Sequence, residues 1–167
     1  MNSLFINSLL EDLKNPDESV REQATRKLWR IWFQQKGIHG LEVIDRTQKL
    51  LDAGAFAEAE AGLTQLIYAQ PDFALCWNRR ASLYYTIGEY QKSLIDCKKV
   101  VNLNPIHFGA LHGMGLSYAV IGEYEKAIKA FRSDERNSTF FSGKSKIYFR
   151  MYNALELKFQ VLRFTKY

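Results

Sequence analysis

Residues 87–93 read IGEYQKS and residues 121–127 read IGEYEKA, so the same short pattern returns after 34 residues. The spacing extends beyond this stretch, because Pro71 and Pro105 are also 34 residues apart. The glycines within the pattern keep the same interval along the chain: Gly54, Gly88 and Gly122. A period of this length indicates a chain built from repeated structural units.

Each unit has the pattern of two helices joined by a tight turn. Apolar side chains recur at helical spacing, as in Trp77, Ala81 and Tyr84, and a glycine follows them. Glycine readily adopts the left-handed backbone that ends many helices, so a second helix can begin just after it. The predicted helix pairs are 41–53 with 56–69, 74–87 with 90–102, and 108–121 with 124–136.

These positions resemble the tetratricopeptide repeat (TPR) family, whose 34-residue signature combines large, small and glycine positions. The best match is the unit that contains Trp77, Tyr84, Gly88, Tyr90 and Pro105. The first unit departs from the signature, with Val43 and Thr47 in place of the tryptophan and the small residue. The resemblance implies an all-α right-handed superhelix of helix-turn-helix repeats with flanking capping helices. The expected divisions are an N-terminal helical hairpin cap (1–38), three repeats within 40–139 (about 40–73, 74–107 and 108–139), and a basic amphipathic C-terminal helix or tail (140–167).

The N-terminal flank predicts two further helices, over residues 3–14 and 17–36. Asn15 is the expected N-cap of the second helix, with Pro16 at its first position. Stacked repeats leave an apolar face at each end unless another element covers it. We therefore expect this hairpin to cap the array.

The net charge of +5 is concentrated at the C-terminal end of the chain. From residue 143 onward one acid, Glu156, accompanies six bases: Lys144, Lys146, Arg150, Lys158, Arg163 and Lys166. Bases interleaved with aromatic residues are typical of single-strand nucleic-acid binders, so an alternative function is nucleic-acid or anionic-membrane association through this tail. The rest of the chain is neutral, which argues against that alternative. The tail could instead cap the last repeat, fill the groove, or enter the groove of a second copy and make a homodimer.

No residue pattern predicts catalysis or metal binding. His39, His107 and His112 lack cysteine or acidic partners at ligand spacing, and Cys76 and Cys97 are too few for a zinc site. The sequence therefore predicts a protein that is not an enzyme and takes no cofactor, metal or small-molecule substrate. The two cysteines favour the cytoplasm or another reducing compartment, and no signal peptide or membrane span is readable.

The family resemblance also implies a concave groove, lined by the first helix of each repeat, that holds an extended peptide or a partner helix. The expected partner-binding residues are Gln48, Asn78, Arg79, Ser82, Tyr85, Thr86, His112 and Leu116. Polar and aromatic side chains on a rigid face suit hydrogen bonding to a main chain together with a few anchors. The predicted function is thus a non-enzymatic protein–protein interaction module or scaffold.

Two details refine this prediction. TPR domains that bind chaperone C-termini clamp the terminal carboxylate with basic and amide side chains, and at the matching positions only Arg79 could do so. A chaperone cofactor of that type is therefore disfavoured. Gly109 and Gly113 fall on the inward side of their predicted helix, and helix glycines indicate that another group packs unusually close.

Overall fold

The structure, a computed structural model, describes residues 3–137, and within them it contains eight α-helices, one short 3-10 helix and no strand. The helices are α1 (Ser3–Asp12), α2 (Glu18–Phe33), α3 (Gly37–Asp52), α4 (Phe56–Ala69), α5 (Ala74–Thr86), α6 (Tyr90–Leu103), α7 (Phe108–Val120) and α8 (Tyr124–Asn137), with η1 (Gln34–Lys36) before α3. The predicted all-α class is confirmed. None of these helices is long and apolar enough to cross a membrane. The predictions for residues 140–167 lie outside the described residues, and the division into cap, repeats and tail stays a prediction.

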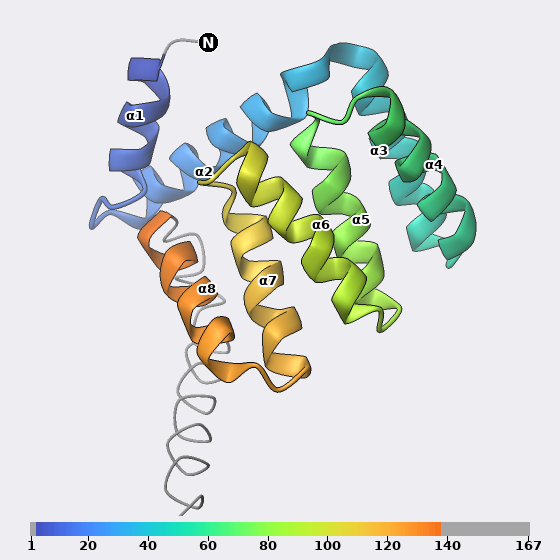
Figure 1. Cartoon of the computed structure of the whole chain (residues 1–167). Helices are drawn as coiled ribbons and strands as arrows, with labels where there is room; N and C mark the ends of the chain where they lie inside the picture. Colours follow the sequence, from blue (N-terminus) through green and yellow to red (C-terminus); the bar gives the residue numbers. More distant parts are fainter. Residues whose placement is uncertain (1–2, 138–167) are drawn as a thin grey trace, which may run out of the picture.

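Three helix pairs, α3–α4, α5–α6 and α7–α8, follow one another in the array, as the repeat predicts (Figure 1). The largest difference from the predicted helix ends is at the start of α3, which begins at Gly37. The turns between the helices depend on Gly54, Gly88 and Gly122, whose φ angles are +73°, +83° and +83°. This left-handed backbone strains any residue with a side chain, which explains why glycine recurs there.

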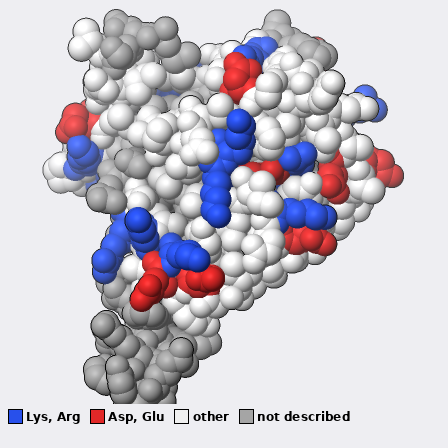
Figure 2. Space-filling view, in the orientation of Figure 1, with Lys and Arg blue, Asp and Glu red and all other residues white. Residues whose placement is uncertain are grey.

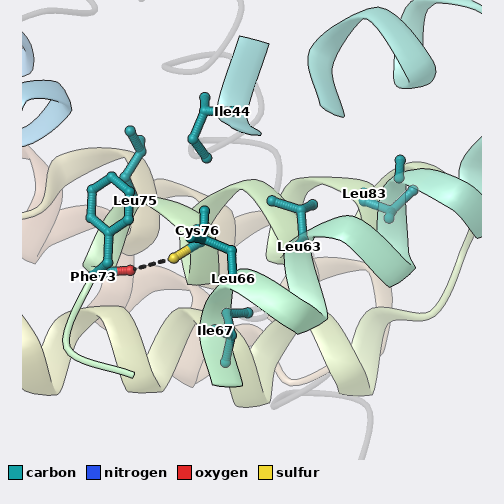
Figure 3. Close-up of a cluster of buried hydrophobic side chains, with 9 residues drawn as sticks. Ile44, Leu63, Leu66, Ile67, Phe73, Leu75, Cys76 and Leu83 are labelled. Carbon is teal, nitrogen blue, oxygen red and sulfur yellow. Dashed lines mark hydrogen bonds between the residues drawn. The ribbon is translucent and has the colours of Figure 1, made fainter. Parts of the chain in front are cut away.

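Small residues let the two helices of each pair approach closely. Ala59, Ser93 and Ala127, which share one position of the repeat, are at most 1% exposed. The close-up of the first core cluster shows how apolar side chains from α3, α4 and α5, among them Ile44 and Leu63, gather around the Cys76 thiol (Figure 3). The 34-residue pattern therefore corresponds to a repeated packing arrangement.

The predicted cap of α2 is wrong by two residues. Asp17 is the N-cap, because its carboxylate accepts the backbone N–H of Ser19 at 2.8 Å. The Asn15 side chain instead accepts the N–H of Asp17 at 2.9 Å and so stabilises the turn that precedes the helix. Asn and Asp are both good caps, and the fold of the α1–α2 turn decided between them.

Helix α2 runs across the N-terminal ends of α5 and α7 (Figure 1). Its Leu28 and Trp32, 1% and 8% exposed, form one cluster with Phe108 at the start of α7. Leu9 of α1 and Leu13, which directly follows α1, belong to the same cluster, and each is 1% exposed. The N-terminal flank is therefore joined to the third helix pair by a shared core.

The two inward glycines have different neighbours. A Cβ at Gly109 would lie 3.1 Å from the Trp29 ring of α2, so the predicted close approach is confirmed there. A Cβ at Gly113 would lie 3.2 Å from the Cys97 sulfur of α6. The close approach predicted at Gly113 is therefore also present, against α6.

Candidate functional site

The eight predicted partner-binding residues lie on three helices. Helix α3 carries Gln48, α7 carries His112 and Leu116, and α5 carries Asn78, Arg79, Ser82, Tyr85 and Thr86. Their exposure differs: Ser82 and Thr86 are exposed, whereas Asn78 is buried and 9% exposed. The other five are half-buried. Only part of the set is therefore open to a partner.

Arg79 is already engaged within the chain. Its Nη1 donates a hydrogen bond of 2.9 Å to the Oε1 of Gln48, whose Nε2 donates to Asp52 at 2.8 Å. The Phe33 ring of α2 lies 5.7 Å from the guanidinium carbon, within cation–π range. Burial lowers the pKa of Arg79 below its ordinary value. The cationic group at this end of the groove is thus held by α2 and α3.

Further along α5, the groove side presents hydroxyls and an aromatic ring. The Ser82 and Thr86 hydroxyls donate to carbonyls one turn earlier in the same helix, at 3.1 and 3.0 Å. These bonds leave the oxygen lone pairs available to accept from a partner. The half-buried Tyr85 ring packs edge-on against Tyr90, with the ring centroids 5.4 Å apart, so its position is fixed before any partner arrives.

On α7, His112 and Leu116 have different surroundings. The His112 ring lies 5.5 Å from the Phe131 ring of α8, so it faces the second helix of its own pair. Leu116 is half-buried, and Val120 one turn later is 50% exposed. Because α5 and α7 pack beside each other, we define the open groove surface as Ser82, Tyr85, Thr86, Leu116 and Val120.

Nothing in the repeated pattern predicts that α2 lies against the expected groove residues. Trp29 contacts Gly109, and Phe33 lies beside Arg79, yet neither belongs to the repeated pattern. The helix glycine at 109 was the one signal that something packs there, and it did not identify the neighbour. Helix α2 thus contacts the expected groove side of α5 and α7 at Arg79 and Gly109.

His107 is the most unusual titratable group near this contact. It is 0% exposed and stacks on Trp32, with ring centroids 4.5 Å apart and planes 19° apart. Its Nδ1 caps α7 by accepting the backbone N–H of Ala110 at 3.2 Å. Burial lowers the pKa of His107 to about 4, because the imidazolium would have no water around it.

This shift predicts that the protein loses stability in mild acid. The unfolded chain binds the proton with the ordinary pKa of 6.5, and the folded chain with a pKa of about 4. The free energy of unfolding is therefore at its full value above pH 6.5. It falls as the pH drops from 6.5 toward 4, because the unfolded chain binds a proton at His107 that the folded chain does not. We expect the free energy of unfolding to drop by about 2 kcal/mol between about pH 7.5 and pH 5 from this group alone.

Urea unfolding at the two pH values measures the drop. The matched control is His107→Asn, because asparagine can still cap the helix but does not titrate. Between the two pH values, the unfolding free energy of this variant should drop by about 2 kcal/mol less than that of the wild type. Equal pH dependence in the two proteins would contradict the assignment.

The described residues offer little for covalent or metal chemistry. No group of three or more histidine, cysteine or acidic side chains among them is arranged to hold a metal ion. Cys76 and Cys97 are buried free thiols whose pKa values burial raises to about 12, so neither is a ready nucleophile. The side chain of His39 lies outside the described residues.

Comparison with known proteins agrees with the helical-repeat fold. The tetratricopeptide repeat family model matches residues 74–107, which comprise α5, α6 and the loop after them. A TPR repeat-containing protein of Rhizobium etli is 42% identical over 69 residues, which are 41% of this chain and 34% of that protein. The chain thus spans about a third of the length of this relative.

Solved structures match over longer stretches. The first TPR of Spaghetti (RPAP3), bound to an HSP90 peptide, superposes with a TM-score of 0.63 at 21% identity, covering 70% of this chain and 92% of that one. The MamA RS-1 ArsTM double mutant superposes with a TM-score of 0.62 at 18% identity, covering 93% of this chain and 83% of that one. At these identities the likeness concerns the fold. Residues 74–107 thus match a tetratricopeptide repeat, and the described part of the chain shares the fold of solved TPR domains.

Proposed function

We propose that this protein-interaction module binds a peptide or a partner helix on its open groove surface. TPR arrays generally act as non-enzymatic interaction modules, and the solved first TPR of Spaghetti holds an HSP90 peptide. The observation that carries the proposal is the stripe of Ser82, Tyr85 and Thr86 on α5, where two exposed hydroxyls flank a ring held by Tyr90. Leu116 and Val120 add apolar contact area from α7.

The remaining predicted residues frame this surface. In the proposal, the hydrogen bond between Gln48 and Arg79 closes the open groove surface at the end next to α2. Asn78 and His112 support the surface from buried and half-buried positions. The open groove surface itself carries no charged side chain. An uncharged, partly apolar segment suits it better than an acidic C-terminus, because the Arg79 guanidinium is already covered by Phe33.

A bulky charged side chain on the open groove surface should weaken this binding strongly. Ser82→Arg places a long side chain at an exposed position, so the fold should be kept while the peptide path is blocked. Peptides selected from a random displayed library on the wild-type chain should bind Ser82→Arg at least about tenfold more weakly. The affinities can be measured by fluorescence anisotropy on the full chain.

The matched control is Gln91→Arg, which adds the same side chain at an exposed position of α6. It should leave the affinity unchanged. If the selected peptides bind Ser82→Arg as tightly as the wild type, partners use another surface and the groove proposal is wrong.

A further inference from the structure

The outer side of the α3–α4 pair carries an open cleft of about 610 Å³. Apolar side chains of α3 and α4 line it, together with small residues of α4: Val43, Leu50, Leu66, Ala61, Gly62 and Ala69. Tyr68, on α4 next to this lining, is 90% exposed and extends the apolar surface. Apolar surface exposed around a hollow is a common feature of protein interaction sites.

The shape of the cleft follows from the departure of the first repeat. Thr47 stands where the other repeats have Ala81 and Gly115, and it is 3% exposed. Gly62 compensates for this larger residue, because a Cβ there would lie only 3.4 Å from the Thr47 methyl group. With Thr47 on α3 and Gly62 on α4, the two helices still pack closely. Because Gly62 has no side chain, the surface of α4 is hollow beside Thr47.

No described element covers this face. Figure 1 shows α3 and α4 at one end of the array, with α5 on their other side. The N-terminal helices are engaged elsewhere, since Leu28 and Trp32 of α2 pack against Phe108 of α7. Stacked repeats need a polar outer face at each end for solubility, so an apolar hollow on an end face favours a covering partner.

The charges at the cleft point to a second copy of the chain as this partner. Arg46 of α3 and Glu58 of α4 both line the cleft, and neither makes an ion pair with another described residue. A surface that carries one free base and one free acid around an apolar centre is self-complementary under a two-fold rotation. A partner surface that is only acidic or only basic would pair with either Arg46 or Glu58 but not with both.

We propose that two copies of this chain form a two-fold homodimer through the α3–α4 face. Arg46 of one protomer pairs with the partner subunit's Glu58, and the reverse pair forms across the axis. The apolar lining of each cleft, with Tyr68 beside it, is then covered by the same surface of the other copy. Aromatic side chains at the centre of such a patch are frequent anchors of interfaces.

Charge exchange tests this arrangement with the full chain. Sedimentation equilibrium over about a hundredfold concentration range should give a dimer with about twice the 19.4 kDa mass of one chain. Arg46→Glu and Glu58→Arg each replace two attractive pairs with two repulsive ones, so either should weaken the dimer at least about tenfold. The double variant Arg46→Glu/Glu58→Arg restores both attractive pairs and should dimerise again. An equimolar mixture of the two single variants should form a heterodimer for the same reason.

The matched controls are Glu125→Arg, which like Glu58 lies in the first turn of a helix, and Lys129→Glu on the same helix α8. Both positions are exposed and distant from the cleft in sequence, and both variants should dimerise like the wild type. A monomeric wild-type chain over the whole range overturns the proposal. A dimer that tolerates both single exchanges overturns it as well, because another surface, such as residues 138–167, then holds the copies together.

Discussion

Replacing Asp96 with alanine is expected to lower the free energy of unfolding by about 3–5 kcal/mol. The Asp96 side chain is 2% exposed and accepts two hydrogen bonds from Arg80, one from Nε at 2.7 Å and one from Nη2 at 2.9 Å. These bonds to the carboxylate raise the pKa of Arg80 above its ordinary value. Without the carboxylate, a guanidinium that is 14% exposed stays charged and loses its partner.

Chemical denaturation followed by circular dichroism measures the loss. The matched control is Asp45→Ala, which removes the acid of the Lys49–Asp45 pair, whose side chains are 76% and 67% exposed. Exposed pairs of this kind contribute roughly 0–1 kcal/mol, so the control should barely change the unfolding free energy. A similar small effect for Asp96→Ala would mean that water reaches Arg80.

The double variant Arg80→Met/Asp96→Leu separates the two contributions. It removes both charges together, so no buried charge is left without a partner, and most of the lost stability should return. The same pair links three helices, because Arg80 of α5 also donates to Thr64 of α4 at 3.0 Å, and Asp96 belongs to α6. If the double variant is as unstable as Asp96→Ala, the hydrogen bonds of Arg80 with Asp96 and Thr64 stabilise the fold beyond the mutual compensation of the two charges.

Trp32→Ala should lower the free energy of unfolding by a similar amount, about 3–5 kcal/mol. The Trp32 ring is 8% exposed and stacks on His107, with Phe108 5.0 Å away between ring centroids. Its removal opens a cavity between α2 and α7 that surrounding side chains cannot fill. The variant should also weaken the acid sensitivity of the protein, because water that enters this cavity brings the pKa of His107 back toward 6.5.

Urea unfolding at neutral and mildly acidic pH reads out both effects. The control is Ile95→Ala on α6, where a large apolar side chain is 64% exposed and its removal should change the unfolding free energy by less than about 0.5 kcal/mol. If Trp32→Ala is no more harmful than Ile95→Ala, helix α2 is not part of the folded core.

The repeat could be predicted from the sequence because it is local. Gly88 ends α5 whatever the rest of the chain does, since its φ of +83° favours glycine, and Gly122 does the same for α7. Small residues such as Ala59 and Ala127 mark helix contacts that recur every 34 residues, so one pattern reports them all. The cap of α2 could not be fixed in this way, because Asn15 and Asp17 are both suited to it and the turn geometry chose Asp17.

The sequence by itself determined the helix pairs, the turns between them and the helix faces that pack inside the array. Only the tertiary structure decided that Trp29 of α2 lies on Gly109 and that Phe33 of α2 lies beside the Arg79 guanidinium. The physical reason is that helix pairs are neighbours in the chain and meet at a fixed interval. The contact between α2 and α7 joins residues that are distant in sequence and is made once, so no periodic pattern records it. It depends on the fit of aromatic side chains in the assembled core.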